Sequence, residues 1–165
     1  MERDLARLIG AMVEYDGGDV RRIHHFMKVH DFAATIAALE GVDAETAYIV
    51  EAAAVVHDIG IHISERKYGN CCGRNQEKEG PAEARKLMHA LGCFTDEQTE
   101  RVCWLVGHHH TYSPVDGIDH QILLEADFLV NVYEDGLSPE AATRFRDSVF
   151  RTRSGIKLLN AMMSL

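Results

Sequence analysis

Residues 53–60 read Ala-Ala-Val-Val-His-Asp-Ile-Gly, an apolar run that ends in a histidine and an aspartate before a glycine. Val50, Ala53 and Ala54 precede His57 at helical spacing, so the run predicts a helix whose apolar face also carries this histidine. A lone ionisable side chain is costly to bury, because it loses its hydration. The stretch therefore predicts a core helix and leaves open what compensates the ionisable residues at its end.

The rest of the chain shows the same helical periodicity, and no stretch alternates with the period of a half-buried strand. Gly41 is typical of a helix end, and Asp43 is a favourable N-cap for the helix that reaches His57. Thr95 and Gln98 have the spacing of a capping box. We expect helices at about residues 5–13, 20–39, 44–58, 81–91, 96–106, 119–133 and from 139 onward. The predicted fold class is all-α.

One region, residues 60–79, breaks the apolar pattern, and its glycines and polar residues predict a loop that shapes a binding pocket. Gly80 and Pro81 follow, and the proline is typical of the first position of a new helix. The length of the chain fits one domain with a real core. We expect a single-domain helical bundle over residues 1–165, with its chemical motifs at about 20–135 and a helical extension at 138–165.

The composition argues against several classes of function. A net charge of -9 offers no basic footprint for a nucleic-acid polymer, and no apolar run approaches the roughly 18 to 20 residues that cross a bilayer. The first residues contain no apolar signal segment, so we expect a cytoplasmic protein. The four cysteines lack a paired C-x-x-C spacing for structural zinc. A small phosphorylated substrate is compatible with this charge, and so is an oligomer.

Four predicted helices each carry an ionisable residue on their apolar face, namely His25, His57, His109 and Asp127, and Asp58 adjoins one of them. A single inward histidine is more often a hydrogen-bonded core residue than a metal ligand. Five inward positions with few lysines or arginines beside them are hard to explain separately. A metal ion compensates them together, since imidazole and carboxylate suit Fe, Mn, Zn, Co or Ni.

Three segments resemble the HD superfamily of metal-dependent phosphohydrolases. Residues 25–29 (His-Phe-Met-Lys-Val) resemble its first histidine helix, residues 53–60 its name-giving His-Asp motif, and residues 124–129 (Leu-Glu-Ala-Asp-Phe-Leu) its final aspartate helix. The resemblance covers about residues 20–135. It implies an HD-type helical bundle in which one divalent metal ion is bound by His25, His57, Asp58 and Asp127.

Family members with two metals have two further histidines between the His-Asp pair and the last aspartate. His109, with His110 next, fits the second of these. In the expected place of the first stands Gln76, and Glu79 is the only nearby carboxylate that we expect could substitute for the missing histidine. We therefore expect one tightly bound metal ion, with His109 and His110 around a second, weaker site or the substrate.

The resemblance implies hydrolysis of a small phosphorylated compound, with a nucleotide as one candidate, by a metal-activated water. The implied catalytic residues are Asp58, which ligates the metal and orients the water, and His109 or His62 as proton donor, with His110 as a further candidate. The predicted substrate-binding residues are Lys28, Lys67 and Gln76, whereas Arg22 is interpreted as a solvated surface charge.

Two other functions are considered. A few proteins with this arrangement are di-iron oxygenases, but these need the complete two-iron ligand set, and Gln76 argues against it. A non-catalytic metal- or ligand-binding regulatory domain could keep the same fold. The retention of all four core ligands argues against that alternative.

Overall fold

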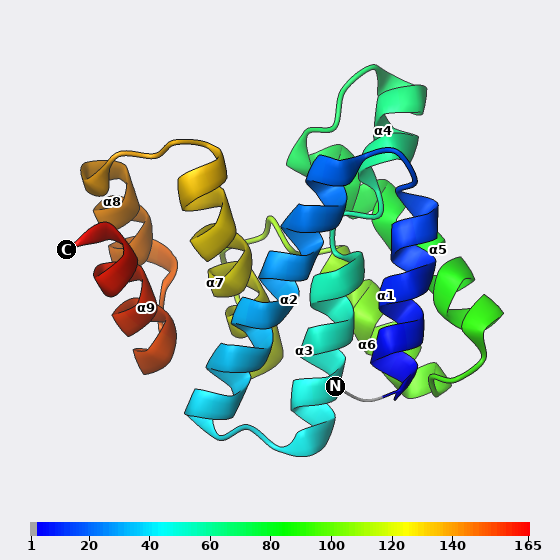
Figure 1. Ribbon diagram of the computed structural model, residues 1–165, viewed down its shortest axis with the longest axis horizontal. Helices are drawn as coiled ribbons and strands as arrows, with labels where there is room; N and C mark the ends of the chain where they lie inside the picture. The colour runs from blue at the N-terminus through cyan, green and yellow to red at the C-terminus, as the bar shows by residue number, and fades with distance from the viewer. Residues whose placement is uncertain (1–2) are drawn as a thin grey trace.

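The computed structural model describes residues 3–165, and within this range it contains nine α-helices and no β-strand (Figure 1). The predicted all-α fold class is thereby confirmed. The helices are α1 (Arg3–Tyr15), α2 (Val20–Glu40), α3 (Ala44–Val56), α4 (Ile61–Tyr68), α5 (Gly73–Leu91), α6 (Asp96–Val106), α7 (Gly117–Glu134), α8 (Pro139–Val149) and α9 (Arg153–Met163).

The helix ends follow local sequence signals. The side chain of Asp43 accepts a hydrogen bond from the backbone N of Thr46 at 3.0 Å, which caps α3. Thr95 and Gln98 form the predicted capping box at the start of α6. Gly41 ends α2 in the left-handed conformation, with φ of 67°, which glycine adopts without a Cβ clash.

The predicted loop at residues 60–79 is wrong, because residues 61–68 form α4 and residues 73–79 form the first turns of α5, which leaves 69–72 as a short connection. Pro81 accordingly lies inside α5 and not at its start. The buried residues in these turns of α5 are Gln76, Glu79 and Gly80, so the helix has no apolar stripe there. Periodicity of apolar residues could not reveal a helix whose inward face is polar.

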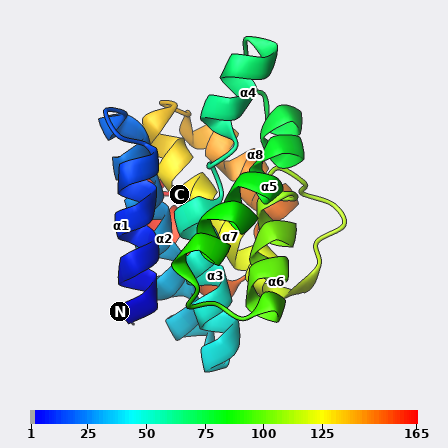
Figure 2. The ribbon, with the colours of Figure 1, turned by 90° about the vertical axis from the view of Figure 1, so that its right-hand side faces the viewer.

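Helices α2, α3 and α7 lie side by side in the middle of the molecule and pack against one another (Figure 1). Figure 2 shows α5 and α6 on the opposite side of α3 from α2, and α4 at one end of the bundle. The C-terminal half of helix α3 is buried, from Val50 to Val56 with the exception of Glu51. Core helices of this kind place their side chains accurately, because tight packing leaves few alternative rotamers.

One stretch of the described residues, Ala44–Tyr68, is long and apolar enough to cross a membrane by length and composition alone. In the structure this stretch comprises α3, a turn and α4, and just over half of its most apolar window is buried inside the protein. Buried core helices meet the same criteria, so the stretch is accounted for by the packing of α3.

Helix α9 packs against α2, α7 and α8, and Phe145 of α8 stacks on Phe128 of α7. The carboxylate of Glu125, fully buried in α7, accepts hydrogen bonds from the backbone N of Arg151 at 2.6 Å and of Thr152 at 2.9 Å. A Cβ on Gly155 would lie 2.0 Å from this carboxylate, so only glycine fits there. These contacts join the start of α9 to the helix that carries Asp127.

Candidate metal centre

The ends of helices bring the candidate ligands together. His57 is the C-cap of α3, and Asp58 follows it in a tight turn that ends at Gly60. A Cβ on Gly60 would lie 2.7 Å from the carbonyl oxygen of Gln76 and 2.9 Å from the nitrogen of Gly80. The absence of a side chain at Gly60 therefore allows the backbone of α5 to approach the turn directly.

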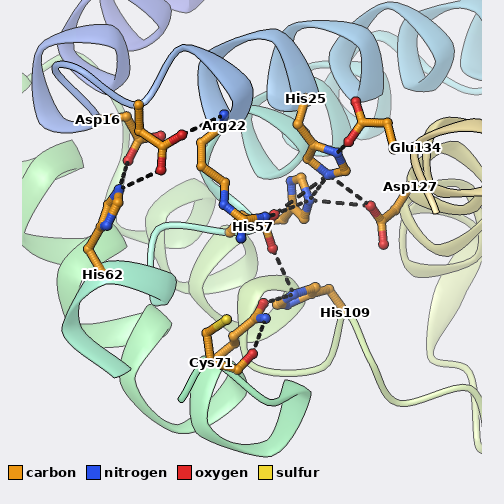
Figure 3. A network of polar contacts seen from close by, with 12 residues as sticks. Asp16, Arg22, His25, His57, His62, Cys71, His109, Asp127 and Glu134 are labelled. Atoms are coloured by element: carbon orange, nitrogen blue, oxygen red, sulfur yellow. Dashed lines mark hydrogen bonds and ion pairs between the residues drawn. The ribbon is translucent and has the colours of Figure 1, made fainter. Parts of the chain in front are cut away.

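Four side chains form what we call the first group, His25, His57, Asp58 and Asp127. Figure 3 labels His25, His57 and Asp127, which point toward one another. His25 Nε2 lies 3.3 Å from His57 Nε2, 3.2 Å from Asp127 Oδ1 and 3.6 Å from Asp58 Oδ2. His57 Nε2 lies 3.6 Å from Asp58 Oδ2 and 3.5 Å from Asp127 Oδ1. The structure thus brings the four predicted ligands of one metal ion within reach of a common point.

The outer nitrogen of each histidine in this group faces an acceptor. His57 Nδ1 lies 2.8 Å from the carbonyl oxygen of Ala54, and His25 Nδ1 lies 3.0 Å from a carboxylate oxygen of Glu134. Because these oxygens can only accept, each Nδ1 carries a proton and donates it. The two Nε2 atoms then face the carboxylates, which is the arrangement of imidazoles that ligate metals. The donor set fits a divalent cation.

A second group shares Asp58 and contains His109, His110 and the carboxamide of Gln76. His109 Nε2 lies 3.5 Å from Asp58 Oδ1 and 3.2 Å from Gln76 Oε1, and His110 Nε2 lies 3.1 Å from the same Gln76 oxygen. His109 Nδ1 donates to the carbonyl oxygen of Val106 at 2.7 Å. Asp58 therefore presents one carboxylate oxygen to each group.

The turn that carries the second group is held by α5. The carboxylate of Glu77 accepts hydrogen bonds from the backbone N of His110 and from the hydroxyl of Thr111, both at 2.9 Å. A Cβ on Gly73 would lie 2.8 Å from two atoms of the His110 ring. The first turns of α5 thus fix the position of His110 through the Glu77 carboxylate and through the close approach of the Gly73 backbone to the His110 ring.

The charges of the first group are balanced by protons in the metal-free protein. Burial opposes protonation of His57, but the Asp58 and Asp127 carboxylates outweigh it and raise the pKa of His57 to about 9. Burial also favours neutral carboxyls, yet the neighbouring His57 lowers the pKa of Asp58, and hydrogen bonds from His25 and His57 lower that of Asp127. A metal cation would replace these protons.

His110 has the opposite environment. Burial, together with the neighbouring His109, lowers the pKa of His110 to about 4. Its imidazole is therefore neutral near neutral pH, which is the state in which histidine ligates a metal.

The other predicted residues lie around the two groups or outside them. The ammonium of Lys28 pairs with the Glu134 carboxylate that also holds His25. Lys67 pairs with Glu79 at 2.5 Å between α4 and α5, outside both groups. His62 lies in a separate cluster, with its Nε2 3.5 Å from a carboxylate oxygen of Asp16 (Figure 3) and 3.4 Å from one of Asp19.

The sequence patterns did not indicate Glu134 at this site, and Arg22 was interpreted as a surface charge. Glu134 lies seven residues after Asp127, two helical turns along the same face of α7, and this spacing could have indicated it. Arg22 lies one turn before His25, and its guanidinium is 3.9 Å from Asp58 Oδ2. The interpretation of Arg22 as a solvated surface charge is therefore wrong, because its side chain faces the shared carboxylate.

Imidazoles and carboxylates that converge from α2, α3 and α7 define a helical protein with a candidate metal centre. The sequence model of the HD domain family matches residues 22–143, and the protein belongs to this family. The resemblance stated from the sequence is thereby confirmed.

One solved structure is similar over nearly the whole chain, a predicted HD superfamily hydrolase from an uncultured Thermotogales bacterium. The TM-score is 0.70 at 26% sequence identity, and the alignment covers 99% of this chain and 88% of the other. No curated protein matches the sequence.

Proposed function

We propose that this protein hydrolyses a phosphoric ester or anhydride bond in a small phosphorylated compound, with a nucleotide as one candidate. The observation that carries the proposal is the convergence of His25, His57, Asp58 and Asp127 in the core. Membership of the HD domain family and likeness to a predicted hydrolase support the same reaction class.

The first group would hold one divalent cation of the series Fe, Mn, Zn, Co or Ni, since its donors are two imidazoles and two carboxylates. Such a cation, when bound, supplies a Lewis acid for a phosphoryl oxygen and lowers the pKa of water from 15.7 towards about 7. Glu134 and the Ala54 carbonyl would keep His25 and His57 in the orientation that presents Nε2.

Positive side chains beside this group would bind the phosphate. Arg22 offers a planar guanidinium 3.9 Å from Asp58 Oδ2, and arginine binds phosphate with paired hydrogen bonds. An open pocket of about 500 Å³ lies next to Glu134 and is lined by Arg21, His24 and Lys28 of α2. The excess of positive charge on α2 supports an anionic substrate.

A proton must also reach the leaving group. His62 and His109 are the candidates, with His109 available only where it ligates no metal ion, and His110 is less suited because its pKa of about 4 leaves it without an extra proton near neutrality. His62 is partly exposed to solvent, whereas His109 is buried beside Asp58. Separate substitution of the two histidines distinguishes them, because the residue that donates the proton controls the basic limb of the pH profile of kcat.

The test is a screen of nucleotides and simple phosphate esters with the protein loaded separately with each candidate metal. We expect release of phosphate or nucleoside from at least one compound, and loss of that release in Asp58→Ala. Glu140→Ala, an exposed change on α8, is the matched control and should leave the rate unchanged. Absence of release from every compound contradicts the proposal, as does uptake of O₂ by a protein that binds two irons.

A further inference from the structure

The side chain of Gln76 is held in one orientation. It is buried, with 8% of its surface exposed, and its Nε2 donates a hydrogen bond to the carbonyl oxygen of Cys71 at 2.6 Å. A carbonyl oxygen only accepts, so the amide nitrogen must lie on this side. Gln76 Oε1 therefore faces the opposite side, where it lies 3.2 Å from His109 Nε2 and 3.1 Å from His110 Nε2.

The atoms around Gln76 Oε1 are themselves electron-pair donors. His109 Nδ1 donates a hydrogen bond to the Val106 carbonyl, so Nε2 is the ring atom that faces Gln76 Oε1. Asp58 Oδ1 lies 3.5 Å from that nitrogen. A carboxamide oxygen, a carboxylate oxygen and an imidazole nitrogen thus face one another in a buried place, where a cation bound among them would compensate the carboxylate charge.

We propose that the carboxamide oxygen of Gln76 is a ligand of a second divalent cation, together with Asp58 Oδ1, His109 and His110. This inference rests on the metal centre of the proposed function, and not on the hydrolysis of phosphate. The Gln76 oxygen would bind the cation, and the hydrogen bond from the amide nitrogen to the Cys71 carbonyl would keep that oxygen pointed at the site. A hydrogen bond alone between Gln76 and His110 is the competing explanation.

The charges of the ligands predict which of the two sites binds a divalent cation more tightly. The first group contains two carboxylates, whereas the second has a neutral amide and only the shared carboxylate of Asp58. Fewer negative ligands give weaker binding of a divalent cation. A carboxamide oxygen also suits Mn²⁺ or Mg²⁺ better than it suits Zn²⁺, Co²⁺ or Ni²⁺, which prefer an imidazole in that position. The second site should therefore bind weakly and favour Mn²⁺.

The experiment is titration of the metal-stripped protein with Mn²⁺, followed by electron paramagnetic resonance of free Mn²⁺. The wild-type protein should show two classes of site, the second weaker by about tenfold or more. Gln76→Leu should lose the weaker class and keep the tight one. A single class in the wild-type protein up to millimolar Mn²⁺ overturns the inference, and so does a weaker class that persists in Gln76→Leu.

A gain of binding separates ligation from a structural role. Gln76→His, titrated with Co²⁺, should bind the second ion about tenfold more tightly or better than the wild type, because imidazole is the stronger donor for this metal. Arg74→His is the matched control, since it adds an imidazole on the exposed face of the same helix and should change nothing. If Gln76→Leu fails to fold, this comparison decides, and unchanged Co²⁺ affinity in Gln76→His overturns the inference.

The two proposals fail in distinguishable ways. Two classes of Mn²⁺ site without release of phosphate from any compound would leave the Gln76 ligand standing and remove the hydrolase. Release of phosphate by a protein with one class of metal site would support the hydrolase and overturn the proposal that Gln76 is a metal ligand.

Discussion

The two ligand groups share Asp58 but are built on different parts of the fold. His25, His57 and Asp127 of the first group project from the packed helices α2, α3 and α7. His109 and His110 lie in the turn after α6, and Gln76 lies in a polar-faced turn of α5. The first group is held by core packing, whereas the second depends on hydrogen bonds and on close backbone contacts.

With both proposals, this difference predicts a tight metal site in the first group and a weaker one in the second. The core group is preorganised and strongly negative, and the turn group is more easily displaced and carries less charge. Substitutions that act on one group alone should change one class of metal site, and a substitution of the shared aspartate should change both.

The largest effect is expected for Asp58→Ala, because this residue gives one oxygen to each group. Both classes of metal site should be lost. Hydrolysis should fall by about a thousandfold or more, which corresponds to about 4 kcal/mol of activation free energy. Asp127→Ala serves as the comparison, since it should remove the tight class and leave the ligands of the second group intact. Retention of both classes in Asp58→Ala contradicts the shared role.

The next effect is expected for Glu134→Ala, which removes the carboxylate that accepts from His25 Nδ1. Loss of such an outer partner typically lowers metal affinity by about 10- to 100-fold. Competition with a chelator of known affinity measures the change, which should be confined to the tight class. An unchanged tight class would show that core packing alone orients His25.

The pH dependence of binding should also separate the groups. In the metal-free protein His57 keeps its proton below a pKa of about 9, and a metal must displace it. The affinity of the tight class should therefore increase with pH up to about 9, by about tenfold per pH unit for one displaced proton. Calorimetry in two buffers of different protonation enthalpy counts the released protons. Binding that releases no proton at pH 7 contradicts this expectation.

The smallest effect is expected for Gly73→Ala, because its Cβ would lie 2.8 Å from the His110 ring and push the ring aside. The weaker class of Mn²⁺ site should lose a few-fold in affinity, and the tight class should not change. Gly10→Ala is the control, since nothing lies within 4 Å of its Cβ. In the exposed face of α1 that change should stabilise the fold by up to about 1 kcal/mol. Equal effects of the two substitutions on Mn²⁺ binding would contradict the role of Gly73.

The first group was predictable because His25 and Asp127 lie on helices with apolar stripes, and His57 and Asp58 directly follow such a helix. His57 follows Val50, Ala53 and Ala54 at helical spacing, and this pattern is sufficient to place the residue inward. The capping box at Thr95 was predictable for a similar reason, since it is a local pattern of two residues.

The second group was less predictable, because its geometry depends on contacts between distant segments. The inward face of α5 at Gln76 and Glu79 is polar, so helical periodicity gave no signal there. The direction of the Gln76 amide is set by the Cys71 carbonyl, and the place of His110 by Glu77. None of these contacts has a sequence pattern of its own.

The contact between Gly60 and the backbone of α5 has a consequence for how the protein could change. Main-chain atoms, and not side chains, fix the separation between the His-Asp turn and position 76. A different side chain at position 76 would leave this separation intact and alter only the ligand atom offered to the proposed second cation. Under this proposal, a single-codon change could alter the metal preference on an unchanged scaffold, independently of the ligands that α2, α3 and α7 supply.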